Sequence, residues 1–586
     1  MPDTKGHVDA KEGRAVQTKD KALNKVDIGK VAKNTSHSVI KQASFLMIAT
    51  LVCRVIGLLY RSPLHNIMGD VGDGYYSLAY EWYNIILLLA SYSIPMAVSK
   101  VMSELLAVKQ YRNAQRVFHA AFLYAVVVGG AGALVAYFGA PVFLSTQPDA
   151  VLALRVLAPT IFLSGLLGVL RGYFQAQNTM LPTSLSQIGE QIINAVISVV
   201  AAWLFTCTVV GDENVIGRLG AAGGTLGTGA GVVAGLVIML FIYFYNKKII
   251  DRRIRRDVGS PEKSFKDIFK MILLMVTPVI LATCVYNLSG IVDQLIFTRI
   301  MSAKDVDADT VSTAYALFGY QFKPILNIPI ALASATSTAL IPTIAGLGAR
   351  KEYKEAENKI HESVSFMMFL AIPCMIGMMV LSYPIIRILY PGSHMDDAAL
   401  TLTIGSISVI FYCLSTVTNG ILQGMGHPSL PVKNSLIALA VNALSLAIFT
   451  LMGLGVYALL LATILYAITV SFFNGLSLKK YIPYRQDVKR SFILPFAAAG
   501  AMGCVVGALY WVPALLLKGI FSSYIVNALW TVLVVLVGML TYIIAFVMIS
   551  GYSEAELKKL PFGTRMCQIL HLLHIPIRGR KDHTIS

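Results

Sequence analysis

The sequence predicts an all-α polytopic membrane protein. Hydrophobic residues make up 56% of its 586 positions, whereas charged residues make up only 13%. The apolar residues fall in runs of about 20, the length of helix that crosses roughly 30 Å of hydrocarbon. Fourteen transmembrane helices are expected, at residues 42–60, 76–103, 117–140, 151–170, 184–206, 219–245, 271–298, 313–346, 361–383, 399–422, 434–452, 455–478, 491–512 and 525–549.

The segments between these spans differ in charge. Alternate segments hold most of the lysines and arginines, and the densest run lies at residues 247–270. Basic residues accumulate in loops that stay in the cytoplasm, so the alternation predicts that the N and C termini are both cytoplasmic. The net charge of +17 then reflects loop orientation and attraction to anionic membrane lipids, and no binding of nucleic acid is expected.

The two ends of the chain are polar. Residues 1–40 are rich in lysine and contain no apolar core of the kind that signal peptides have. We expect residues 1–40 to form a disordered cytoplasmic tail, because such a segment has little apolar surface to bury. Residues 551–586 follow the last expected span and are predicted to be a second cytoplasmic tail.

Two short motifs occur twice and indicate an internal duplication. The Gly-x-x-Gln pattern of Gly172–Gln175 recurs at Gly420–Gln423, and the dipeptide Ile94–Pro95 recurs at Ile328–Pro329. Repeats with an even number of spans are parallel, an arrangement found in alternating-access carriers. The predicted organisation is a six-helix N-lobe (41–245), a basic cytoplasmic linker (246–270), a pseudo-symmetric six-helix C-lobe (271–480) and two C-terminal helices (481–550).

A stripe of glycines lies in the sixth expected span. Gly223, Gly227, Gly231 and Gly235 recur at every fourth position, on one face of a helix. Small residues at this spacing allow the backbone of a neighbouring membrane helix to approach closely. We interpret the stripe as a helix-packing surface rather than a nucleotide-binding loop, because it lies in a span and no strand precedes it.

A few ionisable residues lie inside the apolar spans, above all Arg54, Arg155, Asp293 and Lys323. A charge at membrane depth costs several kcal/mol, roughly 2.5 to 3.5 even on lenient insertion scales, so such residues usually face an aqueous pathway. The cations favour an anionic cargo. One alternative is an ion pair between Arg54 and Glu81. Another is that Arg155 and Lys323 extend to the membrane surface, and Asp293 could simply pair with a nearby cation.

The first span carries a signature, Cys53–Arg61 followed by Met68–Asp70 and Gly74–Tyr76. It resembles the first span of the MurJ-type lipid II flippases, and still more that of their Gram-positive relatives, the stage V sporulation protein B and polysaccharide-export group. Ile94–Pro95, the Gly-x-x-Gln repeat and the segment Glu554–Gly563 are also similar to that group. Two six-helix lobes with two extra helices match the multidrug/oligosaccharidyl-lipid/polysaccharide superfamily.

The resemblance implies a flippase rather than an enzyme. Its cargo would be an undecaprenyl-pyrophosphate-linked peptidoglycan precursor, lipid II, moved by alternating access from the inner to the outer leaflet of the bacterial plasma membrane. Arg54 and Lys323 correspond to headgroup-binding cations, one from each lobe. Arg61 is a further binding candidate and Glu81 a counter-ion. Cell-wall synthesis proteins are expected as partners.

The resemblance also implies an ion-coupling site in the C-lobe. Asp293 is its expected centre, with Asn434, Asn442 and Thr463 on the eleventh and twelfth spans. A carboxylate accompanied by amide and hydroxyl oxygens suits a hard cation. Coupling to Na⁺ or H⁺ is therefore expected, and neither a cofactor nor a further metal site is assigned.

Three other functions fit parts of the sequence. A flippase for another lipid-linked polysaccharide precursor, of capsule, teichoic acid or spores, would share all of these features. A multidrug cation antiporter of the same fold would favour acidic and aromatic residues over arginine in its cavity. A membrane glycosyltransferase would need catalytic acids in a long extracytoplasmic loop, whereas the loops on that side are short.

Overall fold

The computed structural model describes residues 49–550 apart from positions 93, 178, 256, 258–263, 351, 393, 482–485 and 522, together with positions 554, 567 and 568. The described residues are almost entirely helical, which confirms the all-α prediction. The expected tail 1–40 lies outside the described residues, as does nearly all of 551–586.

The helix Ala49–Leu59 begins the described chain. It is followed by α3 (Arg61–Leu87), η1 (Leu88–Tyr92), α4 (Ile94–Ala107), α5 (Tyr111–Phe143), η2 (Pro148–Ala150), α6 (Val151–Ala176), α7 (Leu181–Thr206) and α8 (Glu213–Arg255). The next helices are α9 (Phe265–Ala303), α10 (Ala308–Ala316), η3 (Leu317–Phe322), α11 (Lys323–Ala349), α12 (Tyr353–Val380), α13 (Ser382–Leu389), α14 (Met395–Gly405), α15 (Ser408–Gly424), α16 (Ser429–Leu451) and α17 (Val456–Tyr481). The last are η4 (Lys489–Ile493), α18 (Leu494–Leu516), α19 (Lys518–Phe521) and α20 (Tyr524–Ser550).

The described part of the chain contains 11 helices that are long and apolar enough to cross a membrane, or 12 if α14 and α15, which meet at a 44° bend, form one span. The shorter helix Ala49–Leu59 and the long helix α9 lie where two further spans are expected. These findings establish a polytopic membrane protein. The count of fourteen stays a prediction.

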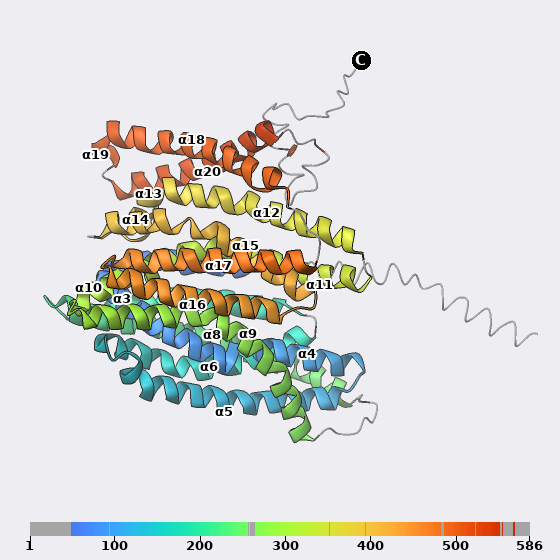
Figure 1. The fold of residues 1–586 in the computed structure, drawn as a ribbon. Helices are drawn as coiled ribbons and strands as arrows, with labels where there is room; N and C mark the ends of the chain where they lie inside the picture. Colours follow the sequence, from blue (N-terminus) through green and yellow to red (C-terminus); the bar gives the residue numbers. More distant parts are fainter. Residues whose placement is uncertain are drawn as a thin grey trace, which may run out of the picture.

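The long helices lie side by side in Figure 1, with α5 and α6 at one edge and α18 and α20 at the other. Helices α4 to α8 pack mainly on one another and on α3, whereas α16 packs on α9 and α17, and α15 packs on α11, α12 and α17. Helix α18 contacts α20 and α12. Contacts of α3 with α10 and η3 join the first half of the chain to the second. The division into two six-helix lobes remains a prediction.

The boundaries of two central helices differ from those expected. Helix α8 continues past residue 245 to Arg255, and α9 begins at Phe265, so most of the expected linker 246–270 is helical. Lysine, arginine and isoleucine fill this stretch. Lysine and arginine favour helix, and their charged ends reach water, so a membrane helix can extend beyond the hydrocarbon.

The glycine stripe is a helix-packing surface, as the sequence predicts, and the structure shows that its partner is α7. A Cβ atom on Gly223 would lie 2.5 Å from the Ala202 Cα, and one on Gly231 would lie 2.6 Å from the Glu190 carbonyl oxygen. Ser198 donates from its hydroxyl to the carbonyl oxygen of Gly224 at 2.8 Å, which joins the two helices further. The stripe therefore brings Glu190 and its neighbours on α7 into a fixed position.

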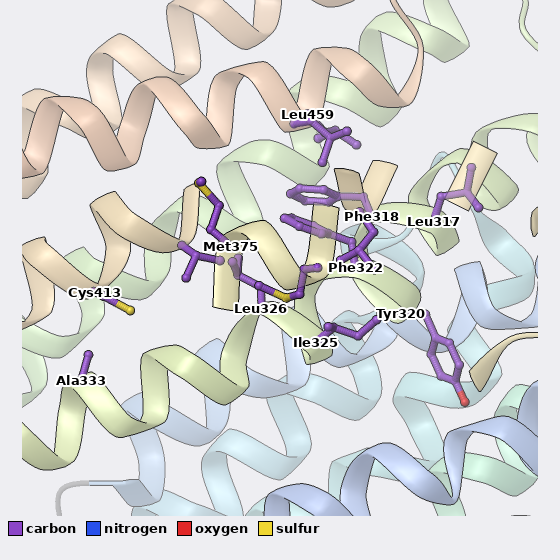
Figure 2. Close-up of a cluster of buried hydrophobic side chains, with 14 of the residues drawn as sticks. Leu317, Phe318, Tyr320, Phe322, Ile325, Leu326, Ala333, Met375, Cys413 and Leu459 are labelled. Carbon is purple, nitrogen blue, oxygen red and sulfur yellow. The ribbon is translucent and has the colours of Figure 1, made fainter. Parts of the chain in front are cut away.

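The segment η3 is a π-helical turn that points its side chains in two directions. The rings of Phe318 and Phe322 stack with centroids 6.1 Å apart and enter a buried cluster with Met375 and Leu459 (Figure 2). Tyr320 lies apart from the two phenylalanines in Figure 2, and its ring meets that of Tyr76 on α3 edge-on. Because η3 is fixed on both sides, the residues that follow it at the start of α11 are fixed as well.

Replacing Gly227 with alanine is expected to destabilise the protein. The added Cβ would overlap the backbone of Ser198 on α7, and overpacking of this kind costs roughly 1 to 3 kcal/mol. The measurement is the thermal unfolding midpoint in detergent. Gly346→Ala in α11 is the matched control, because a Cβ there meets no atom within 4 Å. A Gly227→Ala protein as stable as the control would contradict the close packing of α7 on α8.

Candidate functional site

A polar cavity of about 500 Å³ lies between the helix Ala49–Leu59, α3, α7 and the start of α11. All four residues predicted to bind substrate line it: Arg54, Arg61, Glu81 and Lys323. Its other lining residues are Thr50, Cys53, Gly57, Leu58, Tyr60, Tyr76, Ser77, Tyr80, Asn84, Arg171, Gln187, Glu190, Gln191, Asn194, Gly319, Pro324 and Asn327. The cavity thus brings together side chains from both halves of the sequence.

Lys323 and Glu81 form an ion pair across the cavity. The Lys323 Nζ lies 2.7 Å from the Glu81 Oε1, and the side chains are 26% and 20% exposed. Lys323 also lies 4.6 Å from the centre of the Phe318 ring. The alternative pairing of Glu81 with Arg54 is therefore wrong, because the Glu81 carboxylate is held by the lysine that follows η3.

A second ion pair in the cavity joins Arg171 and Glu190. Arg171 Nη2 lies 2.6 Å from Glu190 Oε2, and Arg171 Nε donates to Ser186 Oγ at 2.9 Å. The expected spans 151–170 and 184–206 leave Arg171 in the connecting segment, on the side predicted to be cytoplasmic, whereas it lies in α6 and lines the cavity. The available signal was its position directly before the repeated Gly-x-x-Gln motif, together with an acid inside the following span.

Arg54 and Arg61 are the remaining cations of the cavity. Arg61 Nη1 donates to the carbonyl oxygen of Tyr320 at 2.9 Å, and the guanidinium lies 4.5 Å from the centre of the Tyr320 ring. Arg54 is exposed to the cavity, and no acidic side chain among the described residues lies within ion-pair distance of it. Arg54 is thus available to an anionic ligand.

The charges that line the cavity do not cancel. Four cationic side chains and two carboxylates face it, which leaves a surplus of two positive charges. In a partly desolvated site such a surplus attracts an anion more strongly than it would in water. The cavity is therefore suited electrostatically to a group that carries two negative charges.

Aromatic and amide side chains complete the cavity, and sequence analysis did not identify them. The rings of Tyr76 and Tyr80 stack with centroids 5.2 Å apart, and the Tyr60 hydroxyl lies 3.5 Å from that of Tyr76. Asn84 and Gln191 add hydrogen-bonding groups. The four-residue spacing of Tyr76 and Tyr80 was a readable signal, since it places both on one face of a helix.

Arg155 lies away from this cavity. Its guanidinium is 5.5 Å from the centre of the Tyr137 ring, between α6 and α5. It is absent from the residues that line the cavity. Arg155 is therefore a cation within an apolar span that does not belong to the site.

The expected ion-coupling residues divide into two groups. Asn442 Nδ2 donates to Asp293 Oδ1, which joins α16 to α9, and both side chains are buried. Asn434 instead donates to Asn474 Oδ1 at 2.8 Å and to Ser477 Oγ at 3.1 Å, toward α17. Thr463 is buried on α17, and no hydrogen bond links it to Asp293 in the described part of the chain. The structure thus brings together Asp293 and Asn442 only.

A second cavity is apolar and has a volume of about 570 Å³. Its wall is formed by α11, α12, α18 and α20, with Pro329, Phe369, Met502 and Tyr542 among the lining residues. The C-terminal helices α18 and α20 therefore enclose an apolar space together with α11 and α12.

Comparison with known proteins identifies the family. The family model described as "Lipid II flippase MurJ" matches residues 114–529. The chain belongs to the MurJ family. It is therefore a bacterial inner-membrane transporter of the flippase type for lipid-linked precursors, and not an enzyme.

Two relatives from Bacillus subtilis (strain 168) cover most of the chain. Lipid II flippase MurJ is 25% identical over 506 residues, which are 83% of this chain and 90% of that protein. Stage V sporulation protein B is 24% identical over 475 residues, 80% of this chain and 89% of that protein. Both alignments extend over most of the helical region described above.

Two solved structures share the fold. "Lipid II flippase MurJ, inward closed conformation" aligns with a TM-score of 0.56 and 16% identity, over 85% of this chain and 97% of that one. An inward-facing multidrug resistance MATE family transporter of the MOP superfamily aligns with a TM-score of 0.57 and 15% identity, over 73% of this chain and 96% of that one. The chain therefore shares the fold of these two transporters.

A double-mutant cycle on Glu81 and Lys323 tests the ion pair in the cavity. Glu81→Gln and Lys323→Gln each leave one unpaired charge, so the double variant should lose less stability than the two single variants together, by about 1 kcal/mol. The measurement is the free energy of unfolding in detergent. The control is Lys359 with Glu362, which are also 2.7 Å apart but about half exposed. Equal coupling in the two pairs would contradict a larger contribution from the partly buried pair of Glu81 and Lys323.

Proposed function

We propose that this protein moves lipid II from the inner to the outer leaflet. The observation that carries the proposal is the surplus of positive charge in the polar cavity, to which Arg54, Arg61 and Arg171 contribute from one half of the sequence and Lys323 from the other. A diphosphate bridge between a lipid and a sugar is a compact anion. Arginine recognises phosphate oxygens with two parallel hydrogen bonds, which makes it well suited to this group.

The four cations differ in how they are held. Glu81 restrains Lys323, and Glu190 restrains Arg171, while Tyr320 holds Arg61. Among these four cations, Arg54 is the one for which the described residues provide neither an ion pair nor a hydrogen-bond partner. We infer that Arg54 makes the first contact with the diphosphate and that Lys323 follows when its bond to Glu81 is exchanged for one to the cargo.

The remaining parts of the cargo find matching surfaces. The tyrosine pair Tyr76 and Tyr80 offers ring faces, and Asn84 and Gln191 offer amide groups, to the sugar and peptide of the headgroup. The apolar cavity between α12, α18 and α20 can receive part of the polyprenyl chain. A lipid-linked precursor therefore has a polar and an apolar region to occupy.

Movement across the membrane requires that the cavity open to each side in turn. We propose that the six-helix lobes 41–245 and 271–480 rock against each other, with both termini in the cytoplasm. The contact of Arg61 with Tyr320 and the hydrogen bond from Ser312 Oγ to the carbonyl oxygen of Val71 join the halves in the present state. These contacts would break when the cavity opens beside them.

A second candidate cargo is another undecaprenyl-linked glycan. Stage V sporulation protein B, whose name specifies no lipid II cargo, is about as similar to this chain (24% identical) as lipid II flippase MurJ is (25% identical). The diphosphate of such a glycan would use the same cations, and only the sugar would differ. A multidrug cation antiporter is disfavoured, because a cavity with surplus positive charge repels cationic drugs.

Cation coupling is proposed at Asp293 and Asn442. Asp293 is 4% exposed, and the Oδ1 atom of Asn442 is buried without a hydrogen-bond partner among the described residues. A buried carboxylate beside an amide oxygen suits Na⁺ or a proton. Asn434 and Thr463 would join this site only after a rearrangement of α16 and α17, since Asn434 bonds to Asn474 in this state.

The Asp293→Asn variant tests this coupling. Transport by the wild-type protein in proteoliposomes should be accelerated by an inward Na⁺ or proton gradient, and the variant should lose this acceleration because it cannot hold the ion by charge. Asn527→Ala serves as the control and should keep it, because Asn527 is a buried amide on α20 that accepts from the Tyr510 hydroxyl and lies outside this site. Equal acceleration of the wild type and Asp293→Asn would place the coupling elsewhere.

The cargo is tested in cells depleted of their own lipid II flippase. The wild-type chain should restore access of an extracellular probe to lipid II, and Arg54→Gln should reduce it by tenfold or more, since loss of one charge-assisted bond costs about 1.5 to 3 kcal/mol. Arg155→Gln is the matched control, because Arg155 lies within a span but outside the cavity.

Each outcome of that experiment has a separate meaning. Failure of the wild-type chain to restore access, at normal membrane levels, would contradict lipid II as the cargo and favour another undecaprenyl-linked glycan. Full activity of Arg54→Gln would contradict the role of Arg54 in headgroup binding.

A further inference from the structure

A histidine and two aspartates lie together beside a bend in α3. The backbone of Gly69 has φ 68° and ψ 178°, a conformation that favours glycine, and it divides α3 between His65 and Asp73. His65 Nδ1 lies 2.7 Å from Asp73 Oδ2, and the two residues are 3% and 0% exposed. Asp70 completes the group, with one ligand atom from each residue lying within 4.8 Å of the others.

The second half of the chain covers this cluster. Gln321 of η3 donates from its Nε2 to Asp70 Oδ1 at 3.2 Å. A Cβ atom on Gly392 would lie 3.0 Å from His65 Nε2 and 3.6 Å from Asp70 Oδ2. Since glycine has no Cβ, these two ligand atoms border the same small space. The backbone of Pro391 also accepts a hydrogen bond from His65.

Two buried oxygens beside the cluster have no hydrogen-bond partner among the described residues. They are Asp73 Oδ1 and Gln321 Oε1, and Gln321 is 2% exposed. A buried polar atom without a partner costs roughly 1 to 3 kcal/mol, so its presence suggests a ligand. A buried carboxylate such as that of Asp73 also requires positive charge nearby. Arg61 supplies one such charge, and His65 supplies another when it is protonated, a place that a bound cation can take.

We propose that His65, Asp70 and Asp73, with Gln321, bind a divalent transition-metal ion of the Zn²⁺ or Mn²⁺ class. An imidazole nitrogen, carboxylate oxygens and an amide oxygen form a donor set that such ions accept. His65 Nδ1 would keep its contact with Asp73, an arrangement common around metal-binding histidines, and Nε2 would exchange its hydrogen bond to the Pro391 backbone for a bond to the metal.

The position of the site gives the ion a role beyond the proposed lipid transport. The cluster lies where α3 meets η3 and residues 388–392, a contact region that also contains the Arg61–Tyr320 bond and a hydrogen bond from Ser62 Oγ to the carbonyl oxygen of Ile388 at 3.2 Å. Tyr390 packs edge-on against the His65 ring, and burial raises the pKa of the Tyr390 hydroxyl, which stays a donor to the Tyr320 carbonyl oxygen. A bound metal would tie the two halves together and stabilise their present arrangement.

Metal content and thermal stability test the proposal without reference to the cargo. The purified full-length protein is incubated with Zn²⁺ or Mn²⁺, desalted and analysed for metal by mass spectrometry. We expect about one ion per chain and a raised unfolding midpoint in the presence of metal. His65→Ala should lose both effects. His394→Ala is the matched control. His394 lies two residues after Gly392 and forms an exposed pair with Asp397, outside the proposed metal site.

Gly392→Ala provides an independent variant that keeps every ligand. Its methyl group would enter the space between His65 and Asp70, so metal retention should fall at least tenfold even if His65→Ala fails to fold. Absence of metal from the wild type would overturn the proposal. A metal ion that is lost from His394→Ala but retained by Gly392→Ala would also overturn the proposal. Such an ion would be bound at the exposed His394 and not in the buried cluster.

Discussion

The structure depends on the high free energy of a charge inside a membrane. Several ionisable side chains of this chain lie within apolar spans, and each must find water, a partner or both. Glu81 meets this requirement through Lys323 at 2.7 Å, and Glu190 through Arg171 at 2.6 Å. Because the partners come from different helices, the ion pairs fix how those helices pack and leave Arg54 facing the cavity.

The apolar framework places these charges. Glycines on α8 let α7 approach closely enough to set Glu190 beside the cavity, and the Phe318–Phe322 stack fixes the start of α11, where Lys323 lies. Backbone and ring contacts hold Arg61 against η3. A cavity with surplus positive charge therefore results from ordinary helix packing, and that charge, together with membership of the MurJ family, supports a diphosphate-linked lipid as cargo.

Local sequence patterns predicted much of this structure. Hydropathy located the helices, a four-residue glycine period predicted the surface between α8 and α7, and rare charges in apolar runs pointed to Arg54 and Lys323 as cavity residues. Contacts between distant segments were harder to predict. The partner of Glu81 is 242 residues away in the sequence. Arg171 was assigned to the segment between two expected spans, because a charge near a span end fits the end of the helix and the loop equally well.

The central claim is that the cavity recognises the diphosphate of a polyprenyl lipid. The most direct test compares the equilibrium binding of undecaprenyl diphosphate and undecaprenol to the purified protein, since the two lipids share the tail and differ in charge. The account predicts that the diphosphate binds at least tenfold more tightly, a difference of about 1.4 kcal/mol, and that the preference weakens as salt is added. Equal binding of the two lipids would contradict it.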